Sequence, residues 1–192
     1  MAGKKARPPH TSPFQFAAST LSSTAGLSNL TSYMPLITQF NPTLAARLPK
    51  THELLLASQL VAHDSVSRIV LHGSRGPANR PRRDSDIDLS LVVNSDDLAK
   101  SSDKEALLAS VLQMTSDHWQ GSVECDLAAV FDQNGCGLKC MTRESFDPML
   151  CSNTIDCMGI FKTTHGFNGF VTGCQIDCRK MYPLMTIWTK QE

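Results

Sequence analysis

The sequence predicts an α+β domain, because segments with strand patterns and segments with helix patterns alternate through its middle part. Short apolar and β-branched runs at residues 67–72, 86–93 and 123–131 indicate three strands. Helix-forming segments at residues 51–63 and 102–117 stand before and between these runs. The chain has 192 residues, of which 41% are hydrophobic and 19% are charged. This size and composition fit one globular domain with its own core.

Residues 1–42 are expected to form a partly ordered N-terminal extension, and residues 43–192 are expected to form the domain. The segment up to residue 52 contains no Asp or Glu and is rich in Ser and Thr, as in an organellar transit peptide. Three prolines among its first 13 residues argue against a long amphipathic presequence. No window approaches the roughly 20 apolar residues of a membrane helix. We therefore expect a cytoplasmic protein that does not enter a membrane.

Local patterns predict where the first elements begin and end. A cluster of leucines indicates the helix over residues 51–63, and the strand over 67–72 stops at Gly73. Ser102 and Glu105 have the spacing of a capping box. We therefore expect Ser102 to cap the helix that follows.

The region after Phe131 is rich in glycine and cysteine, and its pattern is harder to assign. The chain has seven cysteines, so at least one thiol is unpaired. The cysteines of this region form three loose pairs: Cys136 with Cys140, Cys151 with Cys157, and Cys174 with Cys178. The residues of these pairs are separated by three, five and three residues, whereas structural zinc sites favour cysteines separated by two. We favour reduced cysteines acting as small apolar residues over a zinc site. The apolar segment 181–188 is expected to dock on the core, as a helix or as a strand.

Two aspartates mark one face of the second strand. Because successive side chains of a strand point to opposite faces, Asp86 and Asp88 share one face. The other face carries Ile87, Leu89 and Leu91. We expect the first face to be wet and acidic and the second to be buried. Carboxylates are hard ligands that suit Mg²⁺, which proteins hold with a few carboxylates together with substrate phosphates.

A glycine-serine turn precedes these carboxylates. Gly73 permits close approach and unusual backbone dihedral angles. The amides of the turn and the Ser74 hydroxyl can therefore hold phosphate oxygens. Arg75 directly follows Ser74, and we expect it to contact a substrate phosphate. Three further arginines in the loop are weaker candidates for the same role: Arg80, Arg82 and Arg83.

Metal-assisted phosphoryl chemistry needs a third acid, either for a second metal ion or to deprotonate the attacking hydroxyl. Asp126 on the third strand is the preferred candidate. Glu124 shares its face two positions earlier and is the alternative, either replacing Asp126 or assisting it.

Taken together, these motifs carry a family resemblance. In chain order the motifs are Gly73-Ser74-Arg75-Gly76, Asp84-Ser85-Asp86-Ile87-Asp88-Leu89 and Cys125-Asp126-Leu127. Their combination resembles the DNA polymerase beta-like nucleotidyltransferase superfamily, and its minimal nucleotidyltransferase branch most of all. The resemblance covers residues 50–131. It implies the nucleotidyltransferase fold, a mixed β-sheet flanked by helices. It also implies transfer of a nucleoside monophosphate from a nucleoside triphosphate, with ATP as the first expectation, to an acceptor hydroxyl.

The resemblance also implies a role for each site residue. Gly73 and Ser74 would bind the β- and γ-phosphates of the donor. Asp86 and Asp88 would bridge two Mg²⁺ ions, and Asp126 would hold the catalytic ion near the acceptor. Pyrophosphate would be the leaving group.

The acceptor and the nucleotide preference are left open by the sequence. A formal net charge of zero favours a small-molecule or protein acceptor over a long nucleic acid. Two other functions compete with catalysis of this kind. The first alternative is a non-catalytic nucleotide-binding or interaction module. The second is an antitoxin-like nucleotidyltransferase that modifies a partner protein.

Overall fold

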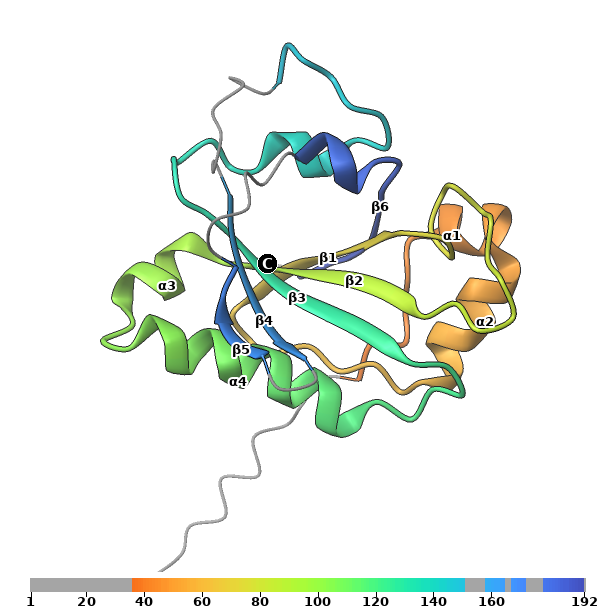
Figure 1. Ribbon diagram of the computed structural model, residues 1–192, viewed down its shortest axis with the longest axis horizontal. Helices are drawn as coiled ribbons and strands as arrows, with labels where there is room; N and C mark the ends of the chain where they lie inside the picture. Colours follow the sequence, from red (N-terminus) through yellow and green to blue (C-terminus); the bar gives the residue numbers. More distant parts are fainter. Residues whose placement is uncertain (1–35, 151–157, 165–166, 172–177, 192) are drawn as a thin grey trace, which may run out of the picture. The chain divides into compact units, whose positions relative to one another are not determined.

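The computed structural model describes residues 36–150, 158–164, 167–171 and 178–191. Its strands form one mixed sheet in the order β5-β4-β3-β2-β1-β6 (Figure 1). The strands are β1 (Val66–His72), β2 (Ile87–Val93), β3 (Cys125–Asp132), β4 (Met158–Thr164), β5 (Phe167–Phe170) and β6 (Met185–Thr189). Strands β2 and β3 are parallel, and the other neighbouring strands are antiparallel. The predicted α+β class with a mixed sheet is confirmed.

The helices are short apart from one. They are α1 (Pro42–Arg47), α2 (Pro49–Ala57), α3 (Ser95–Lys100) and α4 (Lys104–His118), with 3-10 turns η1 (Lys139–Thr142) and η2 (Cys178–Met181). Figure 1 shows α4 running along one side of the sheet and the two 3-10 turns on the other side. The sheet is therefore covered on both faces.

The main core lies between the sheet and the longer helices. Helix α4 contributes Leu108, Val111 and Leu112, and the sheet contributes Ile87 and Leu89 among others. The prediction that Ile87, Leu89 and Leu91 lie on a buried face is confirmed, since all three are almost fully inaccessible. Burial of this apolar area, which contributes about 25 cal/mol per Å², holds β2 in the middle of the sheet.

The opposite face is buried along most of its length, whereas the sequence predicts a wet and acidic face. A second buried cluster covers it, formed by Val70, Val92, Ala128, Val130, Leu138, Cys140, Met141, Met158 and Leu184. At the entry to β2, Asp86 and Asp88 stay partly exposed. The expectation was wrong because the glycine- and cysteine-rich region folds back over this face, and its sequence has no clear periodicity.

The first helical region also differs from the prediction. Instead of one helix over residues 51–63, the chain forms α1 and α2, which meet at Leu48. Asn41 caps α1 by accepting a hydrogen bond from the Thr43 amide at 3.0 Å, and a proline begins each helix. Helix α2 ends at Ala57, and Gln59 takes a φ of 54° just beyond it.

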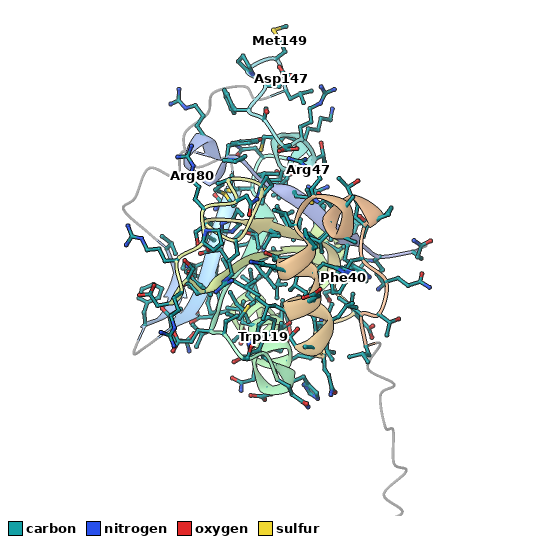
Figure 2. The ribbon with its side chains drawn as sticks, turned by 90° about the vertical axis from the view of Figure 1, so that its right-hand side faces the viewer. Phe40, Arg47, Arg80, Trp119, Asp147 and Met149 are labelled. Atoms are coloured by element: carbon teal, nitrogen blue, oxygen red, sulfur yellow. The ribbon has the colours of Figure 1, made fainter. Side chains whose placement is uncertain are left out.

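The predicted extension over residues 1–42 packs on the domain in the part that is described. Leu36 forms a β-bridge with Val61, and the Asn41 amide donates to the Ile187 carbonyl of β6 at 2.7 Å. Phe40 packs edge-on against His52 beside the first two helices (Figure 2). Residues 1–35 lie outside the described residues.

The last segment settles one open alternative. Residues 185–189 form the strand β6, which pairs with β1 and carries the buried Ile187 into the main core. The predicted docking of this apolar segment on the core is confirmed, and residues 185–188 of it are part of a strand.

Candidate functional site: a glycine turn against paired carboxylates

The turn after β1 lies directly against the second aspartate. His72 at the end of β1 is the register partner of Asp88 on β2. Gly73 follows with a φ of 72°, and a Cβ atom built on it would lie only 1.9 Å from the Asp88 Oδ2 atom. Any side chain here would collide with the carboxylate, in a backbone region that already favours glycine. The close approach expected of Gly73 is therefore present, and the group it approaches is Asp88.

Backbone hydrogen bonds hold the loop from residue 73 to residue 86. The Gly76 amide donates to the Gly73 carbonyl at 3.2 Å, and the Arg80 amide donates to the Ser74 carbonyl at 2.9 Å. A Cβ atom on Gly76 would lie 2.6 Å from the His72 carbonyl oxygen, so this turn too needs glycine. The loop therefore has a defined backbone structure.

Arg75 fastens this loop at two points. Its Nε donates to the Ser85 carbonyl at 2.7 Å, and its own carbonyl accepts from the Thr51 hydroxyl of α2 at 2.9 Å. These contacts give Arg75 a role in holding the turn beside Asp86. Contact between Arg75 and a phosphate stays a prediction. Arg80 is exposed on the same loop (Figure 2).

The three predicted acids come together at one end of the sheet. Asp88 and Asp126 are register partners on the parallel strands β2 and β3. Asp86 lies just before β2. Burial raises the pKa of Asp88 from 3.8 to about 6, the charges of Asp86 and Asp126 contribute to the rise, and Lys162 opposes this shift. The carboxylates are therefore close enough to repel one another.

The structure also shows where the alternative acid lies. Glu124 precedes β3, and its carbonyl accepts a hydrogen bond from the Ile87 amide at 2.9 Å. Asp126 is half-buried and interacts electrostatically with Asp88. By position, Asp126 is the acid paired with Asp88, while assistance from Glu124 stays a prediction.

Lys162 belongs to the acidic group, although no local pattern in the sequence pairs it with Asp126. Its Nζ donates to the Asp126 Oδ2 atom at 2.7 Å. The other oxygen of Asp126, Oδ1, is buried and has no hydrogen-bond partner among the described residues. The only signal in the sequence is a single charged residue within the apolar and small run over 158–164. Its relation to Asp126 depends on the pairing of β4 with β3.

His72 completes the polar end of this face. Its Nε2 atom lies 3.0 Å from the Ser90 hydroxyl. Burial lowers the pKa of His72, the charge of Lys162 lowers it further, and Asp126 opposes the shift. His72 is therefore a neutral, hydrogen-bonded residue beneath the acidic group at neutral pH.

The donor set at this site fits one hard cation held together with phosphate oxygens. Among the described residues, no group of three or more His, Cys, Asp or Glu side chains is arranged to hold a metal ion. Mg²⁺ is commonly bound through one or two carboxylates plus substrate phosphates, and Asp86 and Asp88 supply that pair. Asp126 is already paired with Lys162. The two ions implied by the resemblance stay a prediction.

The predicted absence of zinc concerns residues that are only partly described. Cys136 lies near Asp132, with its Sγ 3.6 Å from the Asp132 Oδ1 atom. Cys151, Cys157 and Cys174 lie outside the described residues. The preference for reduced cysteines over zinc therefore stays a prediction.

Comparisons with known proteins add no family to this picture. No protein-family model, curated protein or solved structure matches the chain. Among the described helices, none combines the length and the apolar character needed to cross a membrane.

Proposed function

We propose that the chain is a Mg²⁺-dependent nucleotidyltransferase that moves a nucleoside monophosphate from a nucleoside triphosphate to an acceptor hydroxyl. The observation that carries the proposal is the contact of the Gly73 turn with the Asp88 carboxylate, with Asp126 paired beside Asp88. A phosphate chain bound at this turn would lie next to the oxygen ligands of a hard cation. The nucleotidyltransferase fold is part of the same proposal, as is a cytoplasmic location.

The chemistry assigns one task to each group. Gly73 and Ser74 hold the β- and γ-phosphates, and Arg75 keeps the turn in place through its bond to Ser85. Asp86 and Asp88, together with phosphate oxygens, hold Mg²⁺, which when bound neutralises charge on the phosphates. We take ATP as the donor to test first.

Transfer makes one bond to the α-phosphorus and breaks another. The acceptor oxygen attacks the α-phosphorus and forms a new oxygen–phosphorus bond. The bond from the α-phosphorus to the bridging oxygen breaks, and its electron pair leaves with pyrophosphate. The proton of the acceptor hydroxyl passes to Asp126. A small molecule or a protein is the favoured acceptor, because the chain has a formal net charge of zero.

The experiment follows label from donor to acceptor. The purified chain is incubated with Mg²⁺, each nucleoside triphosphate labelled at the α-phosphate, and hydroxyl-bearing small molecules and proteins; transferred label and pyrophosphate are measured. Asp86→Ala and Asp88→Ala are each expected to lower transfer by about 100-fold or more, because charge stabilisation in the transition state is lost. Asp84→Ala is the matched control, since Asp84 is exposed in the same loop. Full transfer in either of the first two variants would contradict the proposal.

A second candidate is a nucleotide-binding module without catalysis. The ion pair between Lys162 and Asp126 favours it, because the third acid of the group is engaged by the protein itself. This function predicts a calorimetric binding signal for a nucleoside triphosphate with Mg²⁺ and no transferred label with any acceptor. Label transfer would exclude it.

A further inference from the structure

Lys162 forms an ion pair that is built into the sheet. Strand β4 pairs with β3 in the register Ala129 to Phe161, and Lys162 extends from β4 to Asp126 on β3. The side chains of Lys162 and Asp126 are 30% and 32% exposed. Two adjacent strands fix the backbone of both residues, and the ammonium group is therefore held at the carboxylate.

This pair differs from an ordinary surface salt bridge, which contributes about 0 to 1 kcal/mol. Asp126 Oδ1 is buried without a hydrogen-bond partner among the described residues. A buried carboxylate oxygen without a donor is unfavourable, so Asp126 needs a cation more than an exposed carboxylate does.

The position taken by Lys162 is the one that a second divalent ion would need. A metal ion bound to Asp126 would have to displace the ammonium group from Oδ2 or lie beside it, and like charges at about 4 Å repel strongly where water is partly excluded. Three carboxylates with one ammonium group and one divalent ion are electrically neutral before the triphosphate binds. With Lys162 in place, a second divalent ion is not needed to balance these carboxylates.

We infer that Lys162 takes the place of the second divalent ion, so that this chain binds one divalent ion per nucleoside triphosphate, through Asp86 and Asp88. The inference rests on the proposed function, because it concerns the same site. In this arrangement Asp126 orients Lys162, and the remaining N–H donors of Lys162 are available to a phosphate oxygen or an acceptor hydroxyl. Lys162, supplied by β4, is thus a group that contacts substrate, and Asp126 is the residue that positions it.

The test counts bound ions and does not depend on activity. The full chain is dialysed to equilibrium against Mn²⁺ and the α,β-methylene analogue of ATP, which cannot be cleaved at the reacting bond. The retained Mn²⁺ and the retained analogue are measured per chain. Wild type is expected to retain one Mn²⁺ per analogue, Lys162→Met two, and Lys162→Arg one, because Arg keeps the charge.

Each result decides a different question. Two ions per analogue in wild type, or one ion in Lys162→Met, would overturn the inference and leave the proposed function standing. Retention of neither Mn²⁺ nor analogue by wild type would instead count against the proposed function. Circular dichroism checks that each variant is folded, and Lys162→Gln provides a second neutral variant if Lys162→Met does not fold.

Discussion

Asp88 is a carboxylate that the fold keeps charged at neutral pH at a cost. Its folded-state pKa is about 6, above the ordinary value of 3.8, first because the side chain is buried and then because Asp86 and Asp126 lie near it. The folded protein therefore binds a proton more readily than the unfolded chain between these two values. By linkage, proton binding to Asp88 stabilises the folded state. This contribution to the free energy of unfolding is fully present below about pH 4 and is lost as the pH rises through about 6.

Replacing Asp88 with Asn is expected to stabilise the protein at neutral pH while it removes a group that we assign to the site. The introduced amide would carry no charge beside Asp86 and Asp126. Thermal unfolding should therefore show a higher melting temperature for Asp88→Asn than for wild type at about pH 7.5. The difference between the two melting temperatures should shrink as the pH falls below 6 and disappear near pH 4. Asp84→Asn, in the exposed part of the same loop, should change the melting temperature little at either pH. An Asp88→Asn protein that is less stable at about pH 7.5 would contradict this account.

At the same scale, the sequence identified the acidic residues but not their cation. Asp86, Asp88 and Asp126 could be assigned from residue type and strand alternation, both of which are local. Lys162 lies 36 positions from Asp126 along the chain. Its contact depends on how β4 pairs with β3, and no local pattern encodes that pairing.

Among the elements, α4 was predicted within a few residues, yet its cap was assigned to the wrong side chain. The spacing of Ser102 and Glu105 predicts Ser102 as the cap. In the structure the Asp103 carboxylate accepts from the Ala106 amide at 2.9 Å, and the helix begins at Lys104. Both residue types cap helices well. Ser101, the C-cap of α3, lies two residues before Asp103. Helix α3 itself was not predicted, because its six residues are too few to show a period.

This difference gives a prediction for α4. Asp103→Ala is expected to lower the free energy of unfolding by about 1 kcal/mol, because it removes the acceptor for a helix-end amide. Ser102→Ala is the adjacent control, and we expect a change of less than about 0.5 kcal/mol at this exposed position. Urea unfolding at fixed pH measures both values. Equal losses in the two variants, or a larger loss for Ser102→Ala, would show that the cap is assigned incorrectly.

For the molecule as a whole, the region after β3 provides the second layer of the core. Residues Leu138, Met141 and Leu184 cover the face of the sheet that also carries Asp88 and Asp126. The ion pair between Arg47 of α1 and Glu144 links this region to the first helix. The acidic group is therefore a partly exposed polar patch at one end of a face that is largely buried.

Two methionines of this region test its role. Met141 is fully buried, whereas Met149 is 90% exposed. Met141→Ala is expected to lower the free energy of unfolding by about 2 to 5 kcal/mol, because it leaves a cavity in the second cluster. Met149→Ala should change it by less than about 0.5 kcal/mol. Chemical unfolding measures both free energies, with a check that the dependence of the free energy on denaturant concentration is unchanged. If Met141→Ala lowered the free energy of unfolding as little as Met149→Ala, the region would not pack on the sheet.

Strands β1, β2 and β3, the longest helix, the glycine at the turn and the three acids could be predicted from the sequence, because each leaves a local signal. Three other features depend on the fold: both faces of the sheet are buried, the C-terminal segment returns as β6 beside β1, and Lys162 meets Asp126. These features come from contacts between residues far apart in the chain, where alternation and helical period carry no information. The glycine turn and the acids indicate phosphate chemistry from the sequence, and the number of metal ions that we propose for them depends on a lysine brought in by the fold.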